Sequence, residues 1–183
     1  MLPSSFPSNA LFTVWAGAND IINGGTDLNA YAGNIISSLN ILEGYGAQDI
    51  LVMNLPDLGA TPRLAGDSSY TALTMGFNLA LNDALDVFED DYNGNLFRVD
   101  VFSFMADIGS NFDNSTDAKL NSDGTQNPGS YLFWDDLHPT TQAHELLADY
   151  SEASVPIPGA VWLFGSGIIC ILSASSKRKK TEE

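Results

Sequence analysis

Short apolar runs alternate along the chain with longer segments in which apolar residues recur every three or four positions. Residues 11–16 (LFTVWA) and 49–55 (DILVMNL) are compact and β-prone, which is typical of buried parallel strands. Between them, residues 27–44 have the periodicity of an amphipathic helix. The apolar positions of that predicted helix are Tyr31, Ile35, Leu39 and Leu42.

The same alternation continues toward the middle of the chain. Residues 73–88 predict a second helix, Asn93-Gly94 breaks its pattern, and residues 96–102 predict a third strand. The order strand, helix, strand, helix, strand predicts an α/β fold with a parallel sheet and right-handed crossovers. Residues 107–130 are rich in Asn, Asp, Ser and Gly and predict a long loop. Its carboxylates could bind calcium, although a solvated surface loop is the favoured interpretation; they are Asp113, Asp117 and Asp123.

A carboxylate and a histidine stand three positions apart just before the last predicted helix. Pro139 disfavours the helical conformation for His138 and predicts a helix from Pro139 to about Ser154. Asp135 could then fix the tautomer of a neutral His138 ring that accepts a proton. The alternative is a surface histidine with an accidental acidic neighbour. His144 lies six residues further on, and we expect it on the helix surface, away from the face of His138.

A second polar cluster, Gly17-Ala18-Asn19-Asp20, follows the first predicted strand. Ligands of open α/β sheets gather at the carboxyl ends of strands, so the Asn19 amide could donate a hydrogen bond to a developing oxyanion. For Asn19 taken alone, an Asn-Asp turn or a helix cap is the favoured interpretation.

Taken together, these clusters resemble one family. Gly17-x-Asn19-Asp20 resembles the third conserved block of the SGNH (GDSL) lipases and esterases, and residues 134–140 (WDDLHPT) resemble the fifth. Residues 54–62 (NLPDLGATP) resemble the phospholipase/haemolysin branch. The resemblance covers residues 10 to 152. It implies a flavodoxin-like three-layer α/β/α sandwich and a serine ester hydrolase acting on acyl or acetyl esters, without a metal or organic cofactor.

The resemblance also implies roles for individual residues. His138 would be the general base, Asp135 its orienting carboxylate and Asn19 an oxyanion donor, with Gly17 beside it at the oxyanion or substrate-binding site. The nucleophilic serine of the family lies in a Gly-Asp-Ser-Leu block that precedes the asparagine block. Gly66-Asp67-Ser68-Ser69 imitates that motif, but it follows Asn19, and a turn and helix cap are favoured over Ser68 as nucleophile.

We therefore expect residues 11–152 to form a partial hydrolase domain without its amino-terminal strands, after a disordered or truncated start over residues 1–10. The missing strand would leave an apolar sheet edge unpaired, so we expect the chain alone to be unstable or to need an upstream partner. The alternative function is a non-catalytic exported surface or binding domain, since loss of a triad nucleophile removes on the order of a millionfold of turnover.

Charge is distributed unevenly. The chain has a net charge of −16, yet residues 1–154 hold only three Lys and Arg against 21 Asp and Glu, a net charge of −18. A surface this acidic has no electrostatic attraction for phosphate, which excludes nucleic acid as a probable partner. Residues 155–174 carry no charge and are long enough to cross a bilayer core of about 30 Å. The basic cluster 177–180 follows, so we predict a transmembrane helix with a cytoplasmic carboxyl terminus.

The carboxyl-terminal segment has a resemblance of its own. Residues 155–180, which begin VPIPGAVWLF and end in the basic cluster, resemble the PEP-CTERM/VPxPA sorting signals of Gram-negative bacteria, which an exosortase is thought to process. The resemblance implies that residues 153–183 are a sorting signal. It also implies an exported protein of the cell envelope or extracellular space that is first anchored through residues 155–174.

Overall fold

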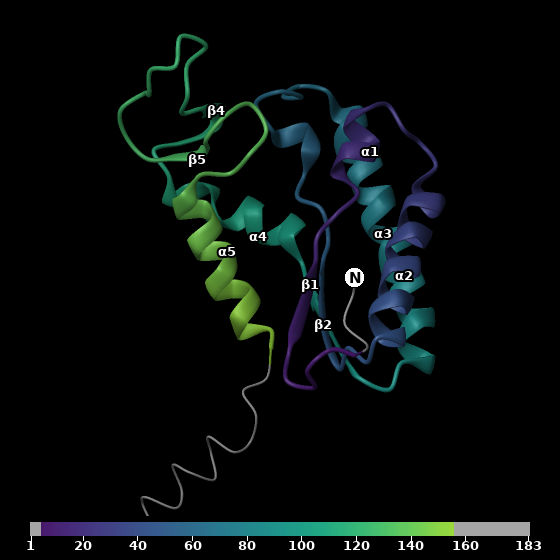
Figure 1. The fold of residues 1–183 in the computed structure, drawn as a ribbon. Helices are drawn as coiled ribbons and strands as arrows, with labels where there is room; N and C mark the ends of the chain where they lie inside the picture. The colour runs from purple at the N-terminus through teal and green to yellow at the C-terminus, as the bar shows by residue number, and fades with distance from the viewer. Residues whose placement is uncertain (1–4, 156–183) are drawn as a thin grey trace, which may run out of the picture.

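The computed structural model describes residues 5–155 of the 183-residue chain. Its main sheet has three parallel strands in the order β1-β2-β3 (Figure 1). The strands are Leu11–Val14 (β1), Asp49–Met53 (β2) and Asn95–Val99 (β3). Leu11 lies opposite Asp49, and Asp49 lies opposite Asn95, so the carboxyl ends of all three strands reach the same edge of the sheet. The predicted α/β fold with a parallel sheet is confirmed.

One face of the sheet is covered by two long helices. They are Leu28–Gly44 (α2) and Ser68–Asp91 (α3). Asp27 and Asp67 each accept a hydrogen bond from a backbone N–H of the first turn, so both helices begin at an acidic N-cap. Ile50 and Val52 of β2 point toward this side and pack with Phe77 of α3 in a fully enclosed apolar cluster. We call this side of the sheet the closed face.

The other face carries two shorter helices. They are Val101–Ile108 (α4) and Thr141–Ala153 (α5). Leu51 and Met53 of β2 point to this side and join a second buried cluster with Met105 and Leu147. In Figure 1, α5 runs obliquely beside the sheet and its last turn lies near the lower end of β1. We call this side the open face.

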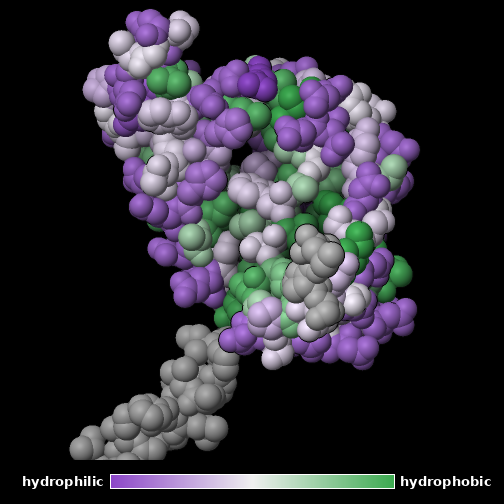
Figure 2. Space-filling model, in the orientation of Figure 1, coloured by the Kyte–Doolittle hydropathy of each residue, from purple (hydrophilic) through white to green (hydrophobic). Residues whose placement is uncertain are grey.

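Strand β1 lies at the edge of the sheet, and no strand among the described residues pairs with its outer side. On the open face Leu11 is 46% exposed and Thr13 is exposed, while Phe12 and Val14 are half-buried on the closed face. The prediction of a buried strand over residues 11–16 is therefore wrong in its burial and its length. Figure 2 shows hydrophobic residues at the surface between α5 and the sheet.

The region between α4 and α5 also differs from the prediction. Strand β3 ends at Val99 and α4 begins at Val101, so residues 101 and 102 are helical instead of extended. The predicted loop 107–130 contains the end of α4 and further short elements. The shorter elements of the fold are Ala18–Ile22 (α1), Leu58–Ala60 (η1), Gly109–Asn111 (η2), Asn114–Ala118 (β4) and Tyr131–Phe133 (β5). Strands β4 and β5 pair in parallel as a separate two-stranded sheet.

The first described residues of the chain pack against the domain, and the last helix ends within one residue of the expected position. The Phe6 N–H donates to the Tyr45 carbonyl at 2.8 Å, and its ring lies 4.6 Å from that of Phe12. A disordered or truncated start over residues 1–10 stays a prediction. At the other end α5 stops at Ala153. Within residues 5–155 no helix is both long and apolar enough to cross a bilayer. Apart from residues 153–155, the predicted transmembrane helix 155–174 and the predicted sorting signal 153–183 lie outside the described residues.

Candidate active site

The carboxylate and the histidine meet in a tight turn between β5 and α5. The Asp135 Oδ1 atom accepts from the backbone N–H of Leu137 at 2.8 Å and of His138 at 2.6 Å. The Trp134 N–H closes the turn by donating to the His138 carbonyl at 2.7 Å. Pro139 cannot donate a backbone N–H, and Thr140 then caps α5 through its side chain. His138 is held just before the helix, as predicted.

The imidazole of His138 contacts the same carboxylate. Its Nδ1 atom lies 2.8 Å from Asp135 Oδ2, while 68% of the His138 side chain stays exposed. Burial raises the pKa of Asp135, but hydrogen bonds from the His138 and Leu137 backbone and from the ring outweigh it, and the pKa is lowered overall. An ionised Asp135 accepts a hydrogen bond from Nδ1–H, which leaves Nε2 as the free acceptor.

The asparagine cluster is shaped by a backbone constraint at Gly17. Its φ is +112°, a conformation that favours glycine, and a Cβ placed there would lie 2.6 Å from the Phe77 ring. The turn at Gly17 starts α1, with Asn19 inside this helix and exposed. The Asn19 side chain makes no hydrogen bond to any described residue, so it is not the capping residue that was the favoured alternative. Its amide remains available to a ligand.

Gly17, Asn19 and His138 line one hollow of about 430 Å³ at the carboxyl edge of the sheet. Its other walls are largely apolar and come from Leu55, Pro56, Leu58, Met105, Phe133, Leu137 and Pro139. Asp135 is not part of the wall; it reaches the His138 ring at Nδ1. The structure thus brings together the four residues predicted for the site. Their catalytic roles stay predictions.

Two residues that the sequence analysis did not assign also line this hollow: Trp15 and His144. Their rings meet edge to face with centroids 6.5 Å apart, and the indole N–H donates to the Asn54 carbonyl at 3.0 Å. His144 is exposed on α5, as expected, but it shares the hollow with His138, which corrects the prediction. The helical-phase argument failed because His138 precedes α5, so helical spacing does not relate the two residues.

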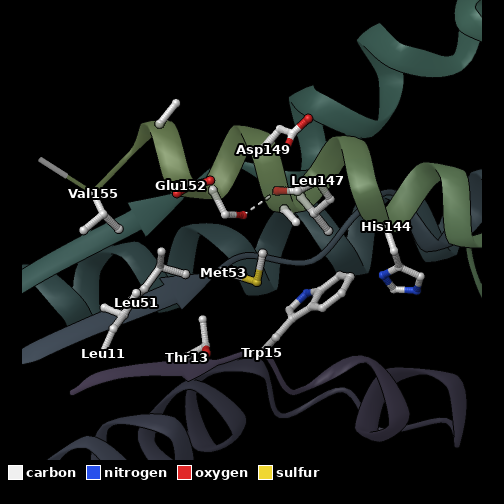
Figure 3. A pocket seen from close by; sticks show the side chains of 13 residues that line it. Leu11, Thr13, Trp15, Leu51, Met53, His144, Leu147, Asp149, Glu152 and Val155 are labelled. Carbon is white, nitrogen blue, oxygen red and sulfur yellow. Dashed lines mark hydrogen bonds between the residues drawn. The ribbon is translucent and has the colours of Figure 1, made fainter. Parts of the chain in front are cut away.

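Trp15 and His144 also stand at one end of a larger groove of about 1260 Å³ on the open face. Figure 3 shows the groove between α5 and the first two strands, with Trp15 and His144 at one end and Val155 at the other. Leu11, Leu51 and Met53 form its floor, and Asp149 and Glu152 on α5 also line it. The groove and the hollow are therefore neighbours that share one aromatic pair.

The remaining candidates have structural roles. Ser68 is the first residue of α3, behind the Asp67 N-cap, and does not line the hollow. Asp113 accepts from Ser130, and Asp123 accepts from Thr125, so these carboxylates stabilise turns. Among residues 5–155 no group of His, Cys, Asp and Glu has the arrangement of a metal site.

The structure is thus a parallel α/β domain that carries an Asp–His pair at the carboxyl edge of its sheet. Residues 4–151 match the model of the GDSL-like lipase/acylhydrolase family, and the chain belongs to that family.

Two relatives and one solved structure extend this comparison. The chain is 27% identical over 173 residues to an uncharacterized protein in the trpE-trpG intergenic region of Pseudomonas putida, covering 82% of this chain and 29% of that protein. It is 30% identical over 162 residues to an acetylesterase of Thermothelomyces thermophilus, covering 76% of this chain and 50% of that protein. The chain thus spans half the length of these relatives or less.

The crystal structure of the acetyl xylan esterase AlAXEase shares the fold with a TM-score of 0.51 at 15% identity. The match covers 80% of this chain and 67% of that one.

Proposed function

We propose that this chain supplies the acid-base pair and an oxyanion donor of a serine-type carboxylic ester hydrolase that acts on acyl or acetyl esters. The observation that carries the proposal is the 2.8 Å contact between His138 Nδ1 and Asp135, with the exposed ring beside Asn19 in one hollow. Membership of the acylhydrolase family supports an ester substrate. Similarity to an acetylesterase supports a short acyl group, which suits a hollow of about 430 Å³.

In this mechanism His138 Nε2 takes the proton of an alcohol nucleophile, whose oxygen attacks the ester carbonyl carbon. The carbonyl oxygen becomes an oxyanion that accepts a hydrogen bond from the Asn19 amide. Collapse of this intermediate releases the alcohol product, which leaves with the proton from Nε2. Water then attacks the acyl carbon while His138 takes its proton, and His138 returns that proton to the nucleophile oxygen as the acid is released. Asp135 stabilises the imidazolium in both halves.

The alcohol nucleophile is the part that the described residues do not provide. Among residues 5–155, none of those that line the hollow is a serine, and the buried Thr61 hydroxyl donates to the Leu58 carbonyl at 2.7 Å. We place the nucleophile in polypeptide that this chain does not contain. The family block Gly-Asp-Ser-Leu is not found in the sequence, and the matched relatives are longer.

The same observation favours a second candidate function, a non-catalytic binding domain. Without an alcohol beside His138, the hollow could still bind an ester or a carboxylate but would not form an acyl-enzyme. The two functions differ in one measurable property, histidine-dependent turnover.

The test is hydrolysis of p-nitrophenyl acetate by this chain and by the longer product that includes the coding sequence upstream of Met1. The chain alone should show no turnover that His138→Ala removes. The longer product should show turnover that falls by about a millionfold on His138→Ala or on loss of its serine. Turnover unaffected by His138→Ala, or no turnover in the longer product, would contradict the hydrolase and favour the binding domain.

In this proposal the acidic domain works outside the cytoplasm of a Gram-negative bacterium, after processing by an exosortase-type enzyme. Its support is the sequence of residues 155–180 and the contrast between their basic end and the acidic domain. Cell fractionation tests it, with the basic residues of the cluster 177–180 changed to Gln. The unchanged chain should be found in the envelope or medium, and the variant should lose that localisation. Recovery of both from the cytosol would contradict export.

A further inference from the structure

The turn that carries the Asp–His pair is held by hydrogen bonds on both sides and has an exposed tip. Trp134 and His138 bond to each other through the backbone, and the Leu120 N–H donates to the Trp134 carbonyl at 2.8 Å. Thr140 binds back to β5 through its N–H and its hydroxyl. The tip, residues 135–137, projects beyond these bonds. Asp135 at this tip is the residue that contacts the His138 ring.

Arg63 is what joins this tip to the rest of the molecule. Its backbone N–H donates to the Asp136 carbonyl at 2.7 Å. Its guanidinium donates to both oxygens of the Asp136 carboxylate, from Nε at 3.1 Å and from Nη2 at 2.8 Å. Within residues 5–155 these are the only hydrogen bonds from residues 135–137 to a residue beyond the turn itself.

The segment that presents Arg63 is itself anchored. Thr61 is buried and donates to the Leu58 carbonyl, and Leu64 donates back to the Thr61 carbonyl at 3.1 Å. The Leu64 side chain packs against the closed-face cluster. Arg63 therefore belongs to an anchored segment and follows by two residues Thr61, which lines the hollow. Its bidentate contact restrains the position of Asp136.

Arg63 is one of few cations in a strongly acidic part of the chain. Only three Lys and Arg occur in residues 1–154, and Arg98, a second of them, is paired with Asp86 and Glu89. The Asp136 hydrogen bond raises the pKa of Arg63, burial opposes this, and the charges of Asp136 and Asp135 add to the rise. The cation is thus coupled to both carboxylates of the turn, although its hydrogen bonds go to Asp136 alone.

We propose that Arg63 is a positioning residue for the Asp135–His138 pair. By fixing Asp136 it holds the tip of the turn, so that the Asp135 carboxylate stays against Nδ1 while Nε2 gains and loses a proton. The value of this positioning to catalysis rests on the proposed function. The positioning itself is a property of the turn and is measurable without turnover.

The experiment is amide hydrogen exchange and ring-proton NMR on the full chain, with Arg63→Ala as the main variant. Both amides that donate to Asp135, those of Leu137 and His138, should exchange about fivefold faster relative to the β2 amides of Leu51 and Val52. The His138 Nδ1 proton signal should broaden because its acceptor becomes mobile. His144, the other of the two histidines, serves as the internal reference for ring signals.

Further variants separate positioning from general stability. Arg63→Lys keeps the charge but not the fork, and it should restore part of the protection. Asp136→Ala should match Arg63→Ala, and the double variant should add nothing to either. Arg98→Ala removes an ion-paired arginine on the closed face and should leave the turn unchanged.

Unchanged exchange at Leu137 and His138 in Arg63→Ala would overturn the proposal, and so would an equal acceleration at the β2 amides, which would indicate global destabilisation. Additive effects of Arg63→Ala and Asp136→Ala would overturn it as well. An inactive longer product would remove the catalytic role of the pair but would not alter the exchange result, so the two proposals fail separately.

Discussion

The two faces of the sheet are built from alternate residues of the same strand, yet they differ in how completely they are covered. Ile50 and Val52 of β2 face α2 and α3 and are enclosed, with Phe77 fully buried beside them. Leu51 and Met53 face α4 and α5, where a groove of about 1260 Å³ opens. The closed face holds most of the large buried side chains. The open face carries the groove, and the hollow with His138 adjoins the groove at Trp15 and His144.

Alternate residues of β2 therefore serve different purposes: those on the closed face contribute to stability, and those on the open face lie near the candidate site. On the closed face the apolar side chains that lie between the sheet and helices α2 and α3 are buried, so substitutions among them should act on folding. On the open face the edge strand β1 leaves Leu11 and Thr13 exposed, and the expectation that the chain alone is unstable stays a prediction. Cooperative unfolding of residues 1–154, measured by calorimetry with no other chain present, would contradict it.

The largest expected effect is on the closed face. Phe77→Ala removes a fully buried ring and should lower the free energy of unfolding by about 3–5 kcal/mol, because the surrounding helices and strand cannot fill the cavity. The matched change on the open face is Leu11→Ala, which removes a half-exposed side chain and should cost less than about 1 kcal/mol. Urea denaturation measures both. Equal losses would contradict the division between the faces.

Gly17 lies between the closed-face core and the candidate site, because it contacts Phe77 and also lines the hollow. Gly17→Ala must adopt a φ of +112° or shift, and its Cβ would meet the Phe77 ring at 2.6 Å. We expect a loss of about 1–3 kcal/mol together with a displaced Asn19. Thermal unfolding and the Asn19 side-chain NMR signals measure these. Gly46→Ala is the control, since its φ is also positive but no atom lies within 4 Å of the added Cβ.

The sequence predicted the closed face better than the open one. Helices α2 and α3 follow from apolar periodicity and acidic N-caps, which are local signals. The start of α4 depends on a residue far away in the sequence, because the Asn54 side chain accepts from the Phe102 N–H. Together with the Asp100 cap, this contact makes β-prone Val101 and Phe102 helical. Strand β4 has the sequence NSTDA, which has no apolar alternation and is extended only because it pairs with β5.

The candidate site shows the same division. Asp135 and His138 are three positions apart, and the proline that follows sets their turn, so their contact could be predicted. Trp15 follows β1 and His144 lies near the start of α5, so only the folded arrangement brings their rings together, and no sequence spacing encodes that contact. Family blocks supplied Asn19 and Gly17, whereas Arg63 was found only from its hydrogen bonds to Asp136.

A smaller effect concerns the groove. An apolar dye such as anilinonaphthalene sulfonate should bind the open face, and Leu11→Lys should weaken binding about threefold by removing part of its apolar floor. Leu79→Lys is the matched control, because Leu79 is 64% exposed on α3, outside the groove. Fluorescence titration of both variants measures the difference. A larger loss in Leu79→Lys would place the exposed apolar site on the closed side instead.

The smallest expected effect is the pH dependence that Asp135 gives to stability. Its pKa lies below the ordinary value of 3.8 in the folded chain, because the hydrogen bonds from His138 and Leu137 outweigh burial. The folded state therefore gains stability above the unfolded pKa and loses it as the pH falls through the lowered folded pKa. The cost of Asp135→Asn should be full at neutral pH and should shrink below about pH 4.

Thermal unfolding across that pH range measures this cost, and Asp123→Asn provides the comparison from outside the site. The pKa of Asp123 is also lowered, by side-chain and backbone hydrogen bonds from Thr125, so the cost of its variant should shrink over the same pH range. Only Asp135→Asn should also accelerate amide exchange at Leu137 and His138, because only Asp135 accepts their hydrogen bonds. A cost of Asp135→Asn that grows toward acid pH would mean that the carboxyl group is protonated in the folded chain, and His138 would then lack its charged partner.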